Sequence, residues 1–205
     1  MTHWRQQQRQ DPYFRKAKEE GYRARSAYKL LQIQEKFHVL RRGDTVIDLG
    51  AAPGSWSQVA SKIVGEQGRI VALDLQTIEP LSGVVTLQGD MTAPEVQAQI
   101  VETAGGKVNV VLSDAAPPKT GIKLRDHTLS IELGYVALSV AEKLLVSGGN
   151  LVIKLFQGED LPGLLHAARA RFRAAKLHTP PATRSESWEV FLVALGFKGN
   201  EPSES

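Results

Sequence analysis

At residues 48–56 the chain reads Asp48-Leu49-Gly50-Ala51-Ala52-Pro53-Gly54-Ser55-Trp56. An apolar strand at 45–47 runs into this stretch, and an amphipathic helix at about 58–64 runs out of it. A strand, a tight glycine-rich turn and a helix start, in that order, present backbone N–H groups and the positive end of a helix dipole to a ligand. Gly50 and Gly54 allow close backbone approach and positive φ angles. The stretch therefore predicts a ligand site at the end of a strand in an α/β sheet.

The spacing of this turn narrows the class of ligand. Its glycines follow a G-x-x-x-G pattern, which is neither the G-x-G-x-x-G of dinucleotide sites nor the G-x-x-x-x-G-K-[ST] of phosphate-binding loops. Pro53 also removes a backbone donor that a pyrophosphate would use. A ligand with an amino-acid end suits the turn better than a ligand with phosphates. We therefore expect S-adenosyl-L-methionine, which has such an end, as the cofactor.

Strand and helix patterns alternate through the rest of the chain. Strands are predicted at 45–49, 69–73, 84–88, 108–113 and 150–155, and helices at 12–20, 26–37, 56–64, 94–103, 127–146 and 160–174. This alternation indicates βαβ units and a doubly wound, Rossmann-like parallel sheet with helices on both faces. A last strand at 190–195 follows the turn-rich segment 179–187 without a helix between them, so we expect it to insert antiparallel.

Composition excludes several classes of protein. The chain has 205 residues, which suits one domain, and no apolar run long enough to span a membrane. It has no cysteine, which excludes disulfides and cysteine-based zinc sites and fits a reducing compartment. Its five histidines are scattered, so we expect no metal. We expect a cytoplasmic protein with no membrane contact.

Positive charge is concentrated near the N-terminus. Residues 1–43 hold 11 Lys/Arg and 4 Asp/Glu, interleaved with aromatic residues. Such a segment is typical of a nucleic-acid contact, although a solvated helix packed by its aromatics has the same composition. We divide the chain into a basic helical RNA-binding segment at 1–43, a catalytic domain at 44–196 and a disordered tail at 197–205. The candidate phosphate contacts are Arg15, Lys16, Lys18, Arg23 and Arg25.

Two acids end the next two strands after the turn. Asp74 follows the strand at 69–73, where a doubly wound fold presents a carboxylate to a ribose diol. Asp90 ends the following strand and could accept a hydrogen bond from an adenine amino group. Either acid alone could simply cap a strand end. Together with the turn, the three successive strand ends indicate a site for an adenosyl cofactor.

The methyl acceptor can be narrowed by exclusion. Methylation of a pyrimidine at C5 needs a cysteine nucleophile, and the chain has none. The turn at 113–118 lacks the aromatic residue that commonly stacks a base whose exocyclic amine is methylated. An oxygen nucleophile remains, and a hydroxyl at neutral pH needs a base or electrostatic assistance. Lys154 is the candidate, since it is the one charged residue in the apolar strand 151–156, although its head could also reach solvent. Asp114 and Glu189 are expected to converge on it.

Several motifs together resemble the FtsJ/RrmJ (RlmE-type) family of RNA ribose 2′-O-methyltransferases. They are D-L-G-A-A-P-G-x-W, S-D-x-A-P, V-x-K-x-F-Q-G, S-x-E-V-[FY]-x-V-A and the basic R-A-R-S-A-Y-K-L at 23–30, and the resemblance covers about residues 13–196. It implies a seven-stranded sheet and a K-D-K-E tetrad at Lys29, Asp114, Lys154 and Glu189. It also implies cofactor contacts at Gly54, Trp56, Asp74, Asp90 and Asp114, besides Gly50 of the turn.

The resemblance further implies the substrate. It points to 2′-O-methylation of a ribose, most often a uridine, in large-subunit (23S-type) ribosomal RNA, by a monomer acting on the large ribosomal subunit or a precursor. In the mechanism that we expect, the 2′-oxygen attacks the methyl group in line, and Lys154 either accepts the proton or assists through its charge alone. Two alternatives stay open: the same chemistry on tRNA, and a non-catalytic RNA-binding assembly factor. The loop at 117–126 has no strong family match and is a candidate substrate loop.

Overall fold

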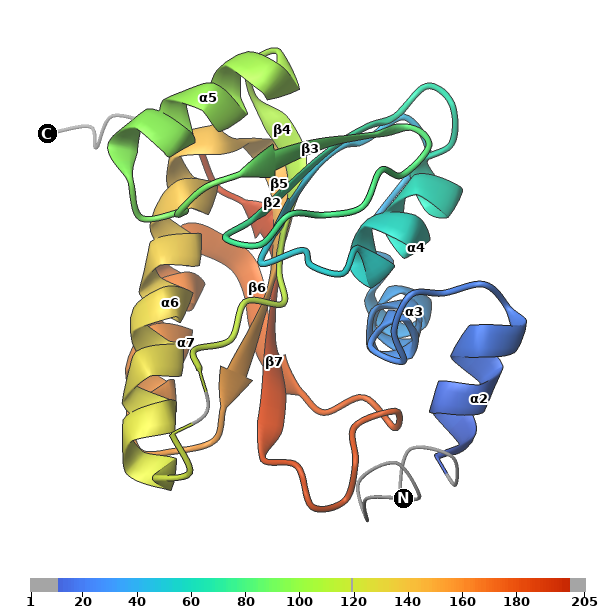
Figure 1. Cartoon of the computed structure of the whole chain (residues 1–205). Coiled ribbons are helices and arrows are strands. Elements are labelled where there is room, and N and C mark those ends of the chain that lie inside the picture. Colours follow the sequence, from blue (N-terminus) through green and yellow to red (C-terminus); the bar gives the residue numbers. More distant parts are fainter. Residues whose placement is uncertain (1–10, 119, 200–205) are drawn as a thin grey trace, which may run out of the picture.

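The computed structural model describes residues 11–118 and 120–199, which form one α/β sandwich (Figure 1). The strands are β1 (Thr45–Leu49), β2 (Arg69–Asp74), β3 (Val84–Gln88), β4 (Val108–Ser113), β5 (Leu145–Phe156), β6 (Phe172–His178) and β7 (Glu189–Phe197). The helices are α2 (Pro12–Glu19), α3 (Ala27–Phe37), α4 (Ser55–Val64), α5 (Pro94–Ala104), α6 (Lys123–Leu144) and α7 (Leu161–Arg171).

One sheet contains all seven strands, in the order β3-β2-β1-β4-β5-β7-β6. The pairs from β3 through β5 are parallel, as the alternation of strands and helices predicts. β7 lies between β5 and β6 and is antiparallel to both of them. The predicted fold class is confirmed: a Rossmann-like, mostly parallel seven-stranded sheet with one antiparallel strand.

Helices cover both faces of the sheet, and each face has its own core. α5, α6 and α7 cover one face, where Val111, Ile153 and Leu138 belong to the larger apolar cluster. α3 and α4 cover the other face, where Leu30 and Trp56 belong to a second cluster. β1 and β4 contribute side chains to both clusters, because a central parallel strand is buried on both sides. α2 packs outside α3, at the edge of the molecule (Figure 1).

The predicted helix at 160–174 is wrong at its C-terminal end. α7 stops at Arg171, and Phe172 begins β6 in extended backbone geometry. The residues of β6, Phe-Arg-Ala-Ala-Lys-Leu-His, favour a helix by local propensity, and most of their side chains are exposed. Pairing with β7 overrides that propensity, as sheet context commonly does.

Three predicted boundaries also shift. α6 begins at Lys123 rather than 127, and β5 begins at Leu145, since α6 runs directly into it. The predicted tail at 197–205 starts too early, because Phe197 is a buried residue of β7 and the Lys198 amide donates to the Arg171 carbonyl oxygen. Residues 200–205 and 1–10 lie outside the described residues. Within the described part of the chain, no helix has the length and apolar character needed to cross a bilayer.

Candidate active site

Strand register brings four predicted residues into one row. Leu49 at the end of β1 pairs with Leu73 of β2 and with Ser113 of β4, and Ser113 pairs with Ile153 of β5. The residue that follows each of these is Gly50 after β1, Asp74 in β2, Asp114 after β4 and Lys154 in β5. The carboxyl ends of parallel strands are the usual ligand site of a doubly wound sheet.

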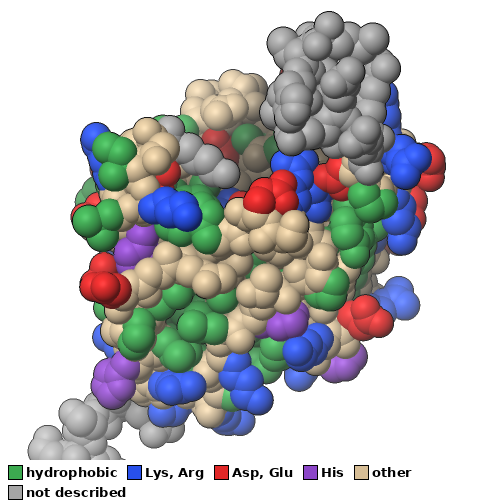
Figure 2. Space-filling model, turned by 90° about the horizontal axis from the view of Figure 1, so that it is seen from below, with side chains coloured by type: hydrophobic (Ala, Val, Ile, Leu, Met, Phe, Trp, Pro, Cys, Tyr) green, Lys and Arg blue, Asp and Glu red, His purple; other side chains and the backbone are tan. Residues whose placement is uncertain are grey.

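A cavity of about 530 Å³ lies along this row. Its lining includes Gly50, Asp74, Asp90, Asp114 and Lys154, together with apolar groups from Leu73, Met91 and Leu133. Figure 2 looks onto this end of the sheet from below and shows a recess with acidic and basic side chains around it. The volume is in the range of small-molecule and cofactor sites, and an apolar lining with a few convergent polar groups is typical of them.

The two strand-end acids keep acceptor capacity toward the cavity. Asp74 accepts the Ala52 amide on Oδ2 at 2.9 Å and the Gln76 amide on Oδ1 at 2.8 Å. Asp90 accepts the Thr92 amide and the Thr92 hydroxyl on Oδ1, both at 2.8 Å, and these bonds lower the pKa of Asp90. A carboxylate has about four acceptor positions, so each acid can still receive hydroxyl or amino donors. These acceptors fit the hydroxyl groups of the ribose and the amino group of the adenine in an adenosyl group.

Lys154 and Asp114 form the first of two ion pairs at the cavity. The Lys154 Nζ lies 2.9 Å from Asp114 Oδ1 and donates to the Asp114 carbonyl oxygen at 2.5 Å. Both side chains are largely buried. The pair is therefore fixed at the edge of the cavity, where Lys154 can face a substrate held against the cofactor.

Lys29 and Glu189 form the second pair. The Lys29 ammonium, on α3, bonds to Glu189 Oε2 at the start of β7 and lies 5.8 Å from the centroid of the Phe191 ring. Phe191 pairs directly with Lys154 across β5 and β7, so the two side chains stand on the same face of the sheet. The structure thus brings the four members of the predicted tetrad together on one face as two neighbouring ion pairs.

Comparisons with known proteins identify the family of the chain. The family model described as FtsJ-like methyltransferase matches residues 22–197. The chain belongs to this family. Its predicted cofactor, S-adenosyl-L-methionine, is confirmed with it.

Relatives in the family are similar over most of the chain. A ribosomal RNA large subunit methyltransferase E from Methanothrix thermoacetophila is 51% identical and covers 89% of this chain and 71% of its own length. A protein of the same name from Pseudomonas fluorescens is 43% identical, over 96% of this chain and 94% of its own. A solved ribosomal RNA methyltransferase from Plasmodium falciparum has a TM-score of 0.77 at 28% identity, covering 87% of this chain and 100% of that one. Aeropyrum pernix fibrillarin, solved with bound S-adenosyl-L-methionine, shares the fold, with a TM-score of 0.59 at 17% identity over 83% of this chain and 73% of that one.

Two residues predicted to contact the cofactor of this FtsJ-like methyltransferase, Gly54 and Trp56, lie at the start of α4. The Trp56 side chain is 1% exposed, and its Nε1 donates to the Ser26 carbonyl oxygen at 3.0 Å. Gly54 precedes α4 with φ +105° and packs near Ile78 and Leu81. Neither residue lines the cavity. Trp56 instead fastens the start of α4 to α3, which supports the turn from beneath.

The predicted phosphate contacts divide into two groups. Arg15, Lys16 and Lys18 on α2 are exposed, with Lys16 in a surface pair with Glu20. Arg25 pairs with Asp11 and donates to the Ala182 carbonyl oxygen. Arg23 donates to the carbonyl oxygens of Pro53, Glu79 and Pro80, at 2.7–2.9 Å. Arg23 and Arg25 therefore use their donors inside the protein, and the three residues of α2 are the cations of that set exposed to solvent.

Arg23 joins the basic segment to the cofactor turn, so we expect Arg23→Ala to weaken cofactor binding. Its guanidinium holds Pro53 of the turn against the loop that follows Asp74, and loss of these charge-assisted bonds leaves both elements less ordered. We expect KM for S-adenosyl-L-methionine to rise about tenfold. Arg15→Ala is the matched control: the KM for cofactor stays at the wild-type value. An unchanged cofactor KM in Arg23→Ala contradicts the expectation.

Asp48 is a buried acid under the turn. It is fully buried at the end of β1, and Ser57 donates to its Oδ2 at 2.6 Å, while Oδ1 has no hydrogen-bond partner. Burial raises the pKa of Asp48 to about 7; the Ser57 hydrogen bond opposes this rise, and the charges of Asp114 and Asp74 add to it. A neutral carboxyl group is thus favoured beneath the cofactor turn at moderately acid pH.

The pKa of Asp48 predicts a pH-dependent stability. The folded protein binds this proton more tightly than the unfolded chain, so stability falls as pH rises from about 4 to about 7, by up to about 4 kcal/mol. The asparagine in Asp48→Asn cannot titrate, so the unfolding free energy of this variant should change less between pH about 4 and about 7. Urea unfolding at several pH values across this range measures the change. In Asp90→Asn the wild-type slope should persist, because the pKa of Asp90 lies below the window. A wild-type slope in Asp48→Asn would refute the assignment.

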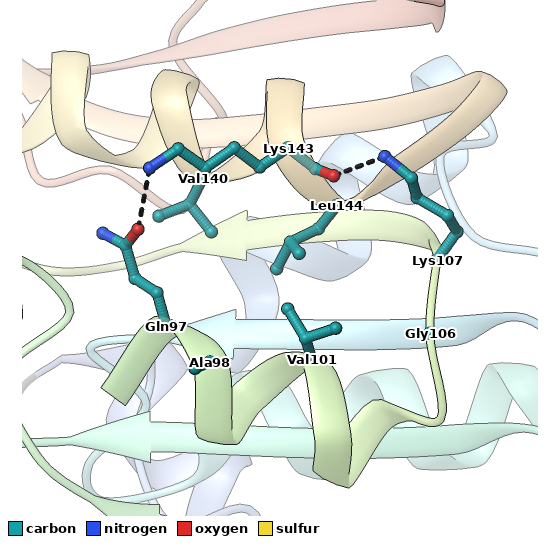
Figure 3. Close-up of a pocket in the computed structure, with 8 residues that line it drawn as sticks. All are labelled: Gln97, Ala98, Val101, Gly106, Lys107, Val140, Lys143 and Leu144. Carbon is teal, nitrogen blue, oxygen red and sulfur yellow. Dashed lines mark hydrogen bonds between the residues drawn. The ribbon is translucent and has the colours of Figure 1, made fainter. Parts of the chain in front are cut away.

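A second cavity lies away from this site, between α5 and α6 beside the start of β4 (Figure 3). It has a volume of about 360 Å³ and an apolar wall from Ala98, Val101, Val140 and Leu144. Lys143 Nζ donates to Gln97 Oε1 at 3.0 Å, and Lys107 Nζ donates to the Lys143 carbonyl oxygen (Figure 3). Its eight lining residues include no carboxylate, imidazole or hydroxyl group, so this cavity lacks the chemistry of the first one.

Other supporting residues escaped the sequence-based prediction. His127 and Ser130 of α6 are buried and bond to Phe156, two residues after Lys154. A polar pair at i and i+3 on an amphipathic helix is the available sequence signal, but it does not reveal the partner strand. Across residues 11–118 and 120–199, no three His, Cys, Asp or Glu side chains gather as metal ligands would.

Proposed function

We propose that the chain transfers the methyl group of S-adenosyl-L-methionine to a ribose 2′-oxygen, most often of a uridine, in large-subunit ribosomal RNA. The relatives named ribosomal RNA large subunit methyltransferase E support ribosomal RNA as the substrate. The proposal assigns RNA contact to residues 1–43, through Arg15, Lys16 and Lys18 of α2, and catalysis to residues 44–196. It also assigns the enzyme to the cytoplasm as a monomer, acting on the large subunit or a precursor.

One observation carries the proposal: two lysine–carboxylate pairs adjoin the cofactor cavity. Lys154 with Asp114 lines the cavity, and Lys29 with Glu189 stands next to it over Phe191. A ribose hydroxyl is a weak nucleophile at neutral pH, and a lysine fixed beside it can assist its reaction. A non-catalytic assembly factor would have no use for this arrangement.

The residues of the chain divide the work as follows. The cofactor, when bound, supplies an electrophilic methyl group on a sulfonium. Asp74 and Asp90 hold the adenosine end, and the turn at 50–54 holds the amino-acid end. Asp114 positions the Lys154 amine, which in its neutral form accepts the proton of the 2′-hydroxyl as the O–CH3 bond forms and the C–S bond breaks. Lys29, held by Glu189, keeps positive charge near this centre. Alignment of the two reactants can contribute about 7–11 kcal/mol to the lowering of the barrier.

Transfer of a labelled methyl group tests the proposal. Large-subunit particles from cells that lack the activity, free ribosomal RNA and tRNA are each incubated with labelled S-adenosyl-L-methionine and the enzyme. We expect label in ribosomal RNA at a ribose, recognised by an alkali-resistant dinucleotide. Label in tRNA alone favours the tRNA alternative, and no label in any RNA favours the assembly factor; either result refutes the proposal.

A further inference from the structure

The loop before α6 exposes apolar side chains beside the active site. Residues 121–125 are all exposed, and Ile122 and Leu124 show 60% and 74% of their surface to solvent. Lys123 and Arg125 alternate with them and are exposed too. Two large, exposed aliphatic side chains that alternate with two cations form a surface that water alone solvates poorly, which indicates a binding surface.

This surface is held rigidly rather than left as a loose loop. Asp126 is buried, and its Oδ1 accepts the Thr120 amide at 2.8 Å and the Thr120 hydroxyl at 2.6 Å. The Thr120 hydroxyl also accepts the Ile122 amide at 3.2 Å. These bonds close the segment 120–126 into a compact turn at the start of α6. The exposed side chains between Thr120 and Asp126 are therefore presented in a fixed direction.

The same turn is anchored to the strand that carries Lys154. His127 Nδ1 bonds to the Phe156 carbonyl oxygen at 2.9 Å, and the Ser130 hydroxyl accepts the Phe156 amide at 3.1 Å. Both side chains are buried. Gly158 packs so tightly on the His127 ring that a Cβ there would lie 2.5 Å from it. The position of the surface relative to Lys154 is thus set by buried contacts.

The surface also borders the cofactor cavity. Ala116 and Pro118, a few residues before it, line the cavity, as does Leu133 of α6. Leu124 precedes Leu133 by nine residues, which is about 13 Å along the helix axis. In Figure 2, hydrophobic and basic side chains gather together on one side of the recess, over the start of α6. Residues 122–125 do not themselves line the cavity, so we expect them to meet the neighbours of a bound nucleotide rather than the nucleotide itself.

We propose that residues 122–125 bind the RNA strand next to the target nucleotide. This inference rests on the proposed function and names a second contact for that substrate, across the cavity mouth from the basic helix α2. Ile122 and Leu124 pack against the faces of splayed bases, and Lys123 and Arg125 pair with the adjoining phosphates. RNA is the partner that the charge favours, because both cations are exposed and the acid of the turn, Asp126, is buried.

Paired alanine substitutions test the apolar contact. In a variant with Ile122→Ala and Leu124→Ala, we expect the particle concentration for half-maximal methyl transfer to rise about tenfold or more. The KM for cofactor and the melting temperature stay at wild-type values, because both side chains are exposed. Val85→Ala is the control, since Val85 is a 46% exposed aliphatic residue near the amino end of β3. Wild-type dependence on particle concentration in the double variant overturns the inference.

A crosslink separates this inference from the proposed function. The chain has no cysteine, so Leu124→Cys gives a single attachment point for a photo-crosslinker, with Val85→Cys as the control. On large-subunit particles we expect the probe at 124, and not at 85, to label ribosomal RNA. Labelling of a ribosomal protein, or of nothing, overturns the inference. The crosslink does not depend on methyl transfer. If the wild-type enzyme transferred no methyl group, the proposed function would be refuted, and the crosslink would still show whether residues 122–125 contact RNA.

Discussion

Lys154→Ala should lower kcat for methyl transfer by about 10²–10⁴-fold, the range that a positioned proton acceptor contributes. The KM for S-adenosyl-L-methionine should change little, because Asp74, Asp90 and the turn at 50–54 remain in place. The measurement is single-turnover transfer of labelled methyl to ribosomal particles at saturating cofactor. Lys176→Ala on β6 is the matched control, since this lysine is exposed, and its kcat should equal that of the wild type.

Lys154→Arg decides what the lysine does. An arginine keeps the positive charge, but it does not give up a proton in proteins and so cannot act as a base. If Lys154 accepts the 2′ proton, Lys154→Arg should be about as slow as Lys154→Ala. Activity within a few-fold of wild type would instead mean that Lys154 acts through its charge alone, and the assignment as a base would fall.

Gly50→Ala should abolish cofactor binding and destabilise the fold. A Cβ at Gly50 would lie 2.4 Å from the Cα of Ala115 and 2.7 Å from its amide nitrogen. These are backbone atoms at the start of the segment after β4, so relief of the clash would push apart the ends of β1 and β4. The positive φ of +68° adds strain for any residue with a Cβ. We expect a loss of stability of roughly 3 kcal/mol or more.

Gly148→Ala separates the clash from the backbone strain. Gly148 also has a positive φ, +85°, but a Cβ there would meet nothing within 4 Å. It lies near the amino end of β5, away from the cavity. We expect this variant to lose about 1 kcal/mol and to bind cofactor normally, as measured by urea unfolding and isothermal titration calorimetry. Equal losses in the two variants would mean that close approach of β1 and β4 is not required.

The sequence predicted the parts of the site that follow from strand ends. Gly50, Asp74 and Asp114 each follow an apolar strand, and Lys154 interrupts the last parallel one. The rule that parallel strands end at one edge is enough to bring them together. The position of Glu189 near Lys154 could also be predicted, because a strand without a preceding helix is expected to insert antiparallel. Local pattern and topology therefore carry most of the fold.

The contacts that the sequence did not predict join distant segments. Arg23 was predicted as a phosphate contact, because a basic sequence does not show which donors face inward. Its carbonyl partners at 53, 79 and 80 are identified only once α3 packs on α4. The burial of the Trp56 side chain was missed for a similar reason, since the side chain of a turn residue can point to the ligand or to the core, and its cofactor contact stays a prediction. In β6, a helix-favouring composition conceals a strand that only β7 stabilises.

The position of β7 makes the second ion pair depend on a completed sheet. β7 is not at the edge of the sheet, but fills the space between β5 and β6 and brings Glu189 to Lys29. A chain in which β7 has not yet docked lacks this ion pair and keeps an open apolar edge on β5. Such a chain would be prone to aggregate rather than retain partial activity. Catalytic competence therefore requires that β7 has docked.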